Sequence, residues 1–415
     1  FITFTCAFIW AVMIFLIFER VGNAVMVHLA QVYKSFWIIV VVITVAFFLF
    51  KLALSLSDID GRKLWKIRCQ KLLRWEFWPG WIFYSPVIFH YFFLALKYRS
   101  LSLPTISNPG MENGGFVGES KAQILKSIED SKCKQSLPFD FISHQLEIPE
   151  KIQIIKNWMS ENEIQFPIIL KHDVDQRGQG VKLIKTETEA LEYLSKNQID
   201  MICQKSALGK REAGIFYIRE PKNKNGFIFS VTEKVFPFIT GDGKTNIKDL
   251  IWEHPRAKFQ SKIFFDRFDD KLESIPKKNE NIPLVFAGNH AQGTLFLSGD
   301  KWISKELENQ IDLISKQIDG FNFGRYDVRF NSTEDLINGE FEIIELNGAT
   351  SEATSIYDPN NPIWSAYKTL FKQWDYAFKV GDGHRKRGLK PIGFLDLFRY
   401  YKASKKKSQK HQISD

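Results

Sequence analysis

The sequence contains little cysteine, four residues in 415, and these four lack the spacing of a metal site. So few cysteines argue against a disulfide framework or a zinc site and favour a reducing compartment. The sequence also lacks internal repeats, a Walker phosphate loop and the dinucleotide fingerprint. Its net charge of +9 is not accompanied by a nucleic-acid recognition motif. We therefore expect no nucleic-acid partner.

Three apolar runs lie within the first hundred residues. Residues 1–18 and 36–54 are apolar almost throughout, and the second run is long enough to cross a bilayer. Residues 79–96 are also apolar, but two prolines and a glycine interrupt them. Residues 1–18 lack the basic leader and small-residue cleavage site of a secretory signal, and a buried core helix is the other alternative. We predict that residues 1–98 form helices inserted in a membrane.

The basic residues around these runs predict the topology. They follow the second run, from Arg62 to Arg74, and the third, at Lys97 and Arg99. Three full spans would place the two basic stretches on opposite sides of the membrane. Two spans and one interfacial or re-entrant segment place both inside, where Lys and Arg are enriched. We predict the inner (cytoplasmic) membrane of a bacterium, with the following domain facing the cytoplasm.

The rest of the chain alternates short apolar strands with amphipathic helices, which is typical of an α/β (α+β) protein. We predict a linker and reduced N-terminal subdomain over 99–150 and an α/β domain over 151–358. C-terminal helices and a basic tail occupy 359–415. We expect the tail, residues 402–412, to be disordered and to lie near anionic lipid headgroups.

Two alternating segments, GRYDVRF and EIIELNG, give the strongest indication of a functional site. Because side chains alternate along a strand, Arg325, Asp327 and Arg329 share one face, and Glu345 and Asn347 share another. The polar stretch between the segments predicts an antiparallel pair, in which the three oxygen-bearing side chains converge. Such ligands suit Mg²⁺. The alternative is two solvated edge strands without a function. The residues expected to face the core are Ile344 and Leu346.

A strand at 166–170 leads into a glycine-bearing loop. Lys171 lies where the strand ends, so its ammonium group can reach a phosphate. Gly178 and Gly180 allow main-chain N–H groups to approach an anion closely. Alone, the pattern is equally typical of an ordinary glycine hairpin. Together with the acidic strands, it indicates a site for nucleotide phosphates.

The order of these elements resembles the ATP-grasp superfamily, the fold of carboxylate–amine ligases such as D-alanine–D-alanine ligase and cyanophycin synthetase. The resemblance covers about residues 120–358. It rests on PIILKHDVDQRGQGV, MICQKSALGKREAG and GRYDVRF…EIIELNGATSEAT. Within the superfamily the sequence is similar to a membrane-attached group, through RWEFWP, GGFVGESK and GNHAQGT.

The resemblance implies roles for individual residues. Lys171 and Arg325 would act in catalysis, Lys171 on the α and β phosphates and Arg325 on the transferred phosphoryl group or the developing oxyanion. The residues implied to hold ATP are Lys171, Gly178, Gly180, Gln204, Lys205, Ser206 and Glu212. The residues implied to hold Mg²⁺, with Mn²⁺ as an alternative, are Asp327, Glu345 and Asn347. The first phosphate lysine of the family is not evident, and the candidates are Lys121, Lys134 and Lys156.

The resemblance further implies an ATP- and Mg²⁺-dependent ligase that activates a carboxylate as an acyl-phosphate for attack by an amine, at the membrane. Its carboxylate and amine substrates would be small molecules or lipid-linked. The alternatives are an ATP-binding sensor or scaffold without catalysis and a kinase acting on a hydroxyl. Asn289, His290 and Arg256 are candidate substrate contacts. A structural histidine and a surface arginine are the alternatives for the last two.

Overall fold

The computed structural model describes residues 6–17, 36–116, 118–174, 180–285, 288–290 and 293–409 of the chain. The chain divides into two compact units, Phe1–Gln70 and Lys71–Asp415. The domain boundaries that we expect at residues 98, 150 and 358 stay predictions.

The first unit is helical over most of its described length. Helix Cys6–Ile17 is short and apolar, and α2 spans Phe36–Ser57. Within the described residues, one stretch, Val40–Ser57, is long and apolar enough to cross a membrane by length and composition. Residues 1–5 and 18 of the first predicted run lie outside the described residues. Insertion in a membrane stays a prediction for both helices.

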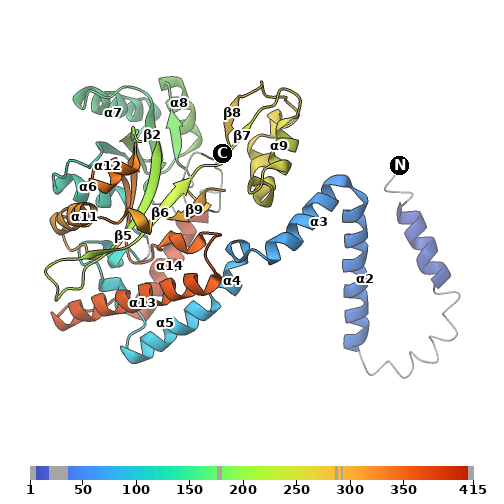
Figure 1. The fold of residues 1–415 in the computed structure, drawn as a ribbon, viewed down its shortest axis with the longest axis horizontal. Coiled ribbons are helices and arrows are strands. Elements are labelled where there is room, and N and C mark those ends of the chain that lie inside the picture. The colour runs from blue at the N-terminus through green and yellow to red at the C-terminus, as the bar shows by residue number, and fades with distance from the viewer. Residues whose placement is uncertain are drawn as a thin grey trace. The chain divides into compact units, whose positions relative to one another are not determined.

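Two antiparallel sheets form the frame of the second unit, and a two-stranded ribbon, β7-β8, lies apart from them (Figure 1). The four-stranded sheet has the order β1-β4-β2-β3, and the five-stranded sheet has the order β11-β10-β5-β6-β9. This mixture of sheets and helices confirms the predicted fold class. The strands are β1 Phe139–Ile142, β2 Ile168–His172, β3 Lys182–Ile184, β4 Met201–Lys205, β5 Arg211–Ile218, β6 Phe227–Val235, β7 Phe238–Thr240, β8 Asn281–Pro283, β9 Leu295–Ser298, β10 Phe323–Phe330 and β11 Glu342–Asn347.

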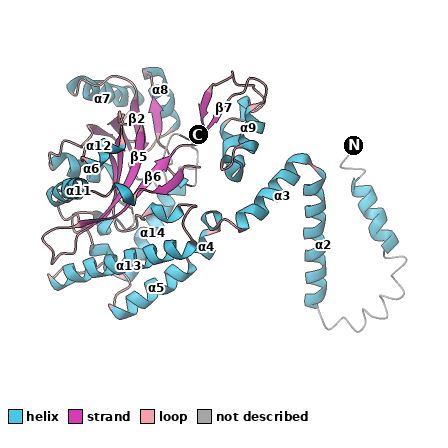
Figure 2. Ribbon diagram, viewed as in Figure 1, coloured by secondary structure: helices cyan, strands magenta, loops and turns pink. Residues whose placement is uncertain are grey.

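Helices of the second unit lie around these sheets (Figure 2). Several begin at a side-chain cap: the hydroxyl of Ser120 accepts a hydrogen bond from the main-chain N–H of Gln123 at the start of α6. The helices from the end of the first unit onward are α3 Ile59–Leu72, α4 Gly80–Phe83, α5 Ser85–Lys97, α6 Lys121–Asp130, α7 Ile148–Glu161, α8 Glu187–Lys196, α9 Ile247–Glu253, α10 Ser261–Arg267, α11 Lys305–Gln317, α12 Thr333–Ile337, α13 Ile363–Lys386 and α14 Phe394–Gln409.

One face of the five-stranded sheet is apolar, whereas the other carries both charged residues and a smaller apolar cluster in which Phe216 and Phe323 pack with Ala377 of α13. Side chains at alternate positions, such as Tyr217, Tyr326 and Val328, form the main core with α6 and α11. The intervening positions carry most of the charged residues of β5, β6 and β10 to the opposite face. The apolar core therefore fixes the position of the strands that carry the charged residues.

The expected core position of Ile344 is wrong, whereas that of Leu346 is confirmed. The pairing register of β10 and β11 shifts between Asp327 and Val328, so that Val328 lies opposite Ile343 and Asp327 lies opposite Glu345. Ile344 is the extra residue of this β-bulge, and Ile343 takes its place in the core. The prediction assumed that side chains alternate regularly along β11, and this assumption cannot reveal an inserted residue.

The third apolar run forms α4 and α5. One face of α5 packs against α13, with Val87 and Leu94 buried there. The two helices lie side by side in Figure 1. Because a neighbouring helix covers one face only, the other face of α5 stays outside the core.

The expectation that residues 402–412 are disordered is wrong for residues 402–409. These residues complete α14, which starts at Phe394. Alanine and lysine are good helix formers, so the polar segment continues the helix that its apolar start initiates. Residues 410–412 lie outside the described part of the chain.

We expect Gly381→Ala to destabilise the second unit. A Cβ atom at this position of α13 would lie 2.5 Å from the carbonyl oxygen of Leu103. The backbone around Leu103 would have to move, so we expect a loss of about 1–3 kcal/mol of unfolding free energy. Urea denaturation followed by tryptophan fluorescence measures this. Gly80→Ala is the control, because its Cβ would make only an ordinary contact with Tyr84. Equal midpoints for both variants would contradict the prediction.

Candidate functional site

The charged residues of β10 and β11 lie together on the face of the five-stranded sheet opposite the main core. The two strands are antiparallel, as predicted, with Asp327 opposite Glu345 and Arg325 opposite Asn347. Directly opposite residues on one face are close neighbours. The Nδ2 atom of Asn347 lies 3.5 Å from Oδ2 of Asp327. The structure therefore brings together four of the residues that the sequence predicted for the site.

Asp327 is buried between two cations. Arg325 donates two hydrogen bonds to it, from Nε to Oδ1 at 2.9 Å and from Nη2 to Oδ2 at 3.2 Å. The Nζ atom of Lys234 lies 3.1 Å from Oδ1. Burial alone would raise the pKa of the Asp327 carboxyl, but Arg325 and Lys234 outweigh burial and hold the pKa below its usual range. Asp327 is therefore an anion at neutral pH.

A glycine makes room for this pair. Gly214 of β5 lies opposite Asp327, and a Cβ there would come 3.0 Å from Cδ of Arg325 and 3.3 Å from Oδ1 of Asp327. A larger residue would push the guanidinium group away from the carboxylate.

Lys234 is a central residue of the site that the sequence reasoning missed. Its Nζ atom donates to Oε1 of Glu212 at 2.8 Å as well as contacting Asp327. Burial lowers the pKa of Lys234, but Asp327 and Glu212 more than compensate and raise it. Lys234 and Glu212 lie opposite each other on β6 and β5. Counting the register outward from the turn of this hairpin would have paired Glu212 with Glu233, because a register shift between Phe216 and Tyr217 moves the pairing by one residue.

Glu212, one of the residues implied to hold ATP, lies against the loop that contains Gly288. Arg329 donates to its Oε2 atom at 3.3 Å, on the side opposite Lys234. A Cβ atom at Gly288 would lie 2.3 Å from Oε1 of Glu212 and 2.6 Å from Cδ of Lys234. The loop that carries Asn289 and His290 thus starts against this charged pair.

Lys171 joins the two sheets. It belongs to β2 of the four-stranded sheet, yet its Nζ atom donates to the carbonyl oxygen of Ile344 on β11 at 3.1 Å. It also donates to Oε1 of Gln204 at 2.8 Å. Burial and Lys121 lower the pKa of Lys171 to about 8, while Glu345, Asp173 and Asp327 act against this shift. Because the bulge residue Ile344 adjoins Glu345, Lys171 reaches the acidic strands from the other sheet.

The other implied nucleotide residues lie along β2, β4 and the connection between β2 and β3. Gln204 is buried, and its Nε2 atom has no hydrogen-bond partner among the described residues. Lys205 ends β4, and Ser206 follows it. Gly180 has a positive φ of 64° and packs against the His172 ring, whereas Gly178 lies outside the described residues.

The three lysine candidates for the first phosphate contact differ in position. Lys121 starts α6, and its Nζ atom lies 3.4 Å from the carbonyl oxygen of His172, next to Lys171. Lys156 forms an exposed ion pair with Glu187 at 2.8 Å, and Lys134 is exposed. Of the three, Lys121 is the one that the structure places beside Lys171.

Glu119 is a second site residue that the sequence reasoning missed. Burial and the neighbouring Glu345 raise the pKa of its carboxyl to about 7, although Gly348, Lys121 and Arg325 act in the opposite direction. Its Oε2 atom has no hydrogen-bond partner among the described residues. The glycine-rich segment GGFVGESK was the signal, since it brings Gly115 against Gly348 next to the acidic strands.

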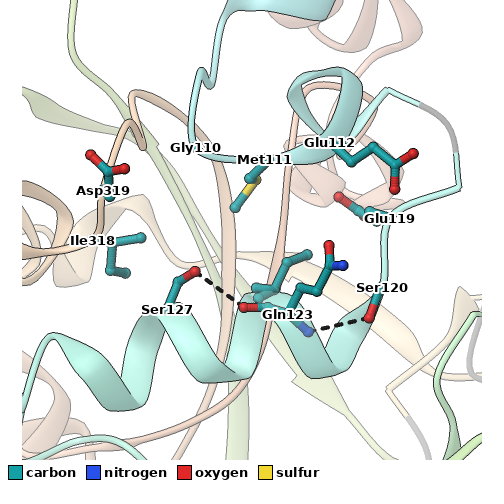
Figure 3. Close-up of a pocket in the computed structure, with 10 residues that line it drawn as sticks. Gly110, Met111, Glu112, Glu119, Ser120, Gln123, Ser127, Ile318 and Asp319 are labelled. Atoms are coloured by element: carbon teal, nitrogen blue, oxygen red, sulfur yellow. Dashed lines mark hydrogen bonds between the residues drawn. The ribbon is translucent and has the colours of Figure 1, made fainter.

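A small cavity lies at the start of α6, with Glu119 on its wall (Figure 3). Its volume of about 20 Å³ admits roughly one water molecule. Ser120 and Ser127 hydrogen-bond the main chain of Gln123 beside it. The cavity is too small for a nucleotide, and neither Asp327 nor Lys171 lines it.

Two of the candidate substrate residues, Arg256 and His290, pack against the turn Trp75–Phe77. Arg256 donates to Oε1 of Glu76 at 3.1 Å and approaches Nδ1 of His290 at 3.4 Å. Because arginine cannot accept a hydrogen bond, Nδ1 of His290 is the acceptor. The Nε2–H group then donates to the carbonyl oxygen of Glu76 at 3.1 Å. Whether Asn289, His290 or Arg256 contacts a substrate stays a prediction.

The donor set on β10 and β11 fits a hard cation in its chemistry. Asp327 and Glu345 offer carboxylate oxygens, and Asn347 offers an amide oxygen. Within the described ranges, no group of three or more His, Cys, Asp or Glu side chains is placed to hold a metal ion. Any cation here would therefore be held by two carboxylates, an amide and oxygens of a bound substrate.

Comparisons with known proteins find structural similarity only. No protein-family profile and no curated protein matches the chain. Solved structures that resemble it are ATP-grasp ligases, the superfamily that the sequence resembles, with low identity and partial coverage. The VanG D-Ala:D-Ser ligase of Enterococcus faecalis is 11% identical, with a TM-score of 0.36, over 65% of this chain and 64% of that one.

Two further structures are similar at the same level. The D-alanine–D-alanine ligase of Coxiella burnetii is 12% identical, with a TM-score of 0.36, over 71% of this chain and 64% of that one. A bifunctional glutathione synthetase of Pasteurella multocida is 13% identical, with a TM-score of 0.33, over 61% and 36%. The chain spans less than two thirds of the length of each of the three. Similarity this low adds nothing about substrate or mechanism.

The protonation of His290 should make stability depend on pH. Burial lowers its pKa from 6.5 to about 4. Between these values the unfolded chain binds more protons than the folded chain, so the free energy of unfolding falls as the pH falls through this window. We expect His290→Asn to remove about 1–3 kcal/mol of that decline, measured by urea denaturation at several pH values. Asn289→Gln, in the same loop, should leave the slope unchanged, and an unchanged slope in His290→Asn would refute the prediction.

Proposed function

We propose that the chain is an ATP- and Mg²⁺-dependent ligase at the membrane that activates a carboxylate as an acyl-phosphate for attack by an amine. The single observation that carries the proposal is the position of Lys171. Its ammonium group crosses from β2 to the main chain of β11, next to Glu345 and within electrostatic reach of Asp327. A nucleoside triphosphate with its metal ion requires a cation for the phosphates and an acidic cluster for the metal ion. Here the cation comes from one sheet and the acidic cluster from the other.

The charged residues of the site fit the phosphate half of the reaction. Phosphoryl transfer requires mainly positioning and neutralisation of negative charge. Three cations lie around Asp327 and Glu345: Lys171 and Lys234 are buried, and Arg325 is partly buried. A Mg²⁺ ion held by Asp327, Glu345 and Asn347 would supply further neutralisation of the phosphate oxygens. With a pKa of about 8, Lys171 is still mostly protonated at neutral pH.

The carboxylate half requires an activated intermediate. A carboxylate is a poor electrophile, and transfer of the γ-phosphoryl group to one of its oxygens provides a leaving group for the incoming amine. Arg325, which adjoins Asp327, would stabilise negative charge that develops on the carbonyl oxygen, in exchange for its present hydrogen bond from Nη1 to the carbonyl oxygen of Glu352 at 3.0 Å. Water must be excluded during this step, since it would hydrolyse the acyl-phosphate.

Nucleotide binding has a supporting observation in Gln204. A buried amide nitrogen without a partner among the described residues is costly and fits an acceptor atom on a ligand. Gln204 also accepts a hydrogen bond from Lys171. One side chain would therefore contact both the nucleotide and the lysine that binds its phosphates. The carboxylate and amine substrates are proposed by class alone, either as small molecules or linked to lipid.

Removing either acidic residue should abolish turnover. We expect Asp327→Asn and Glu345→Gln to lower ADP release by about 10²–10³-fold or more, because each removes charge that neutralises the phosphates or holds the metal ion. The measurement is a coupled ADP assay on purified protein, screened with carboxylate and amine mixtures and followed by product mass. Glu340→Gln, an exposed residue just before β11, is the matched control.

The outcomes separate this function from other uses of the same fold. ADP release that needs both a carboxylate and an amine supports the ligase. Nucleotide binding without turnover in any mixture, or a phosphorylated hydroxyl as product, would refute it. Full activity in Asp327→Asn would refute the site itself.

The pH dependence of nucleotide affinity tests Lys171 directly. Its pKa of about 8 means that the ammonium group loses its proton as the pH rises through that value. Affinity for ATP should therefore fall between about pH 7 and pH 9. Lys171→Arg should bind ATP without this decline, because arginine stays charged. Fluorescent-nucleotide titration measures both, and a flat profile in the unmodified protein would contradict the role of Lys171.

A further inference from the structure

Helix α5 has two apolar faces, and only one of them is covered by protein. Val87 and Leu94 are 4% and 1% exposed and pack in the cores that α5 shares with α13. The opposite face is exposed, with Phe89 at 75% and Leu96 at 79%. We call this opposite face the α5 outer face. Its residues are Ile88, Phe89, Phe92, Phe93 and Leu96.

The α5 outer face is a continuous stripe. Its residues recur at helical spacing, so that they line one side of the helix without an intervening charge. Exposed apolar residues continue into the preceding segment, at Trp81 of α4 and at Leu72 and Leu73. Over the described remainder of the second unit up to residue 390, exposed large apolar side chains are more widely spaced along the chain. A contiguous apolar surface of this kind marks an interaction site.

Basic residues flank the stripe. Lys97 and Arg99 follow it directly, and both are exposed. No acidic residue occurs from Ser85 to Arg99. On the adjacent α13, Lys368 and Lys372 are also exposed. The acidic neighbour from α13, Asp375, lies 3.1 Å from His90 of α5. Apolar residues followed directly by exposed cations suit a surface that is apolar inside and anionic outside.

Hydrogen bonds connect the segment after α5 to the end of α13 and to the residues just before α14, which is another basic helix. Arg385 donates to the carbonyl oxygen of Tyr98 at 2.7 Å, and Ser102 donates to that of Ile392 at 2.6 Å. Helix α14 begins two residues later and exposes Leu395 and Phe398 beside Arg399 and Lys402.

We propose that the α5 outer face lies in the interface of an anionic lipid bilayer, with its aromatic side chains at the acyl boundary and Lys97 and Arg99 at the phosphates. The helix has 13 residues, a length of about 20 Å, which is too short to cross a hydrocarbon core of about 30 Å. Because α13 covers its other face, α5 lies along the membrane rather than across it.

Two features of the chain favour a membrane, rather than a second copy of the protein, as the partner of the α5 outer face. The candidate span, Val40–Ser57, and the start of α5 at Ser85 are separated by 27 residues, 58–84. This connection is long enough for α5 to reach a bilayer that surrounds the span. In a twofold pair, Lys97 and Arg99 of both copies would meet without acidic partners from α5. The inference is independent of the nucleotide chemistry, since none of its residues belongs to the site around Asp327.

The test measures contact with lipid at single positions of the full chain. The four native cysteines are replaced by alanine, and Phe89→Cys, Phe93→Cys or Leu313→Cys is labelled with an environment-sensitive fluorophore. Each protein is placed in nanodiscs of phosphatidylcholine with phosphatidylserine, or of phosphatidylcholine alone. Lipids brominated in the acyl chain should quench most of the emission at 89 and 93. They should leave the label at 313 unquenched, because exposed Leu313 belongs to α11, away from α5.

Charge reversal tests the basic border. Lys97→Glu with Arg99→Glu should reduce quenching at position 89 in discs with phosphatidylserine and should leave it nearly unchanged in phosphatidylcholine alone. Equal quenching at 89 and 313 would overturn the proposal. So would protection of position 89 without quenching in discs that hold two chains, which would assign the face to a second copy. ATP turnover does not enter this test, so its failure and that of the proposed ligase are distinguishable.

Discussion

One lysine crossing between two sheets is the contact on which the arrangement of the candidate site depends. Lys171 is buried, and its Nζ atom is satisfied by Gln204 of its own sheet and by the carbonyl oxygen of Ile344 on the other. That carbonyl is available because a β-bulge inserts Ile344 into β11. The bulge therefore places a main-chain acceptor next to Glu345. It determines both where the lysine ends and where the acidic side chains point.

The rest of the site consists of charges that tolerate burial because they neutralise one another. Lys234 lies between Glu212 and Asp327, and Arg325 contacts Asp327 from the other side. Removing one member of such a buried network costs about 3–5 kcal/mol, since the partner is left unpaired. The same cations that stabilise the folded chain are the groups that would meet phosphate. Binding of a nucleotide would therefore exchange one set of charged contacts for another.

The sequence predicted the site residues with a local pattern and missed those whose position depends on the fold. Asp327 and Glu345 follow from strand alternation, and Lys171 follows from its place at a strand end. Lys234 gave no local signal, because its partner Glu212 lies across a hairpin whose register contains a shift near Phe216. Glu119 was missed because a glycine-rich loop was interpreted without knowing which strands it would touch. His290 and Arg256 were predicted as substrate contacts, but their partner Glu76 is 214 and 180 residues away along the chain.

By itself, the sequence determined the class of fold, the apolar stretch of α2 and the pairing of β10 with β11. These depend on period, caps and composition, which are local properties. The tertiary structure decided that Ile343 rather than Ile344 enters the core, that Lys171 reaches β11, and that α5 has one covered and one exposed face. Each of these features depends on contacts between residues that are far apart in the sequence. The spacing of side chains along one segment does not predict such contacts.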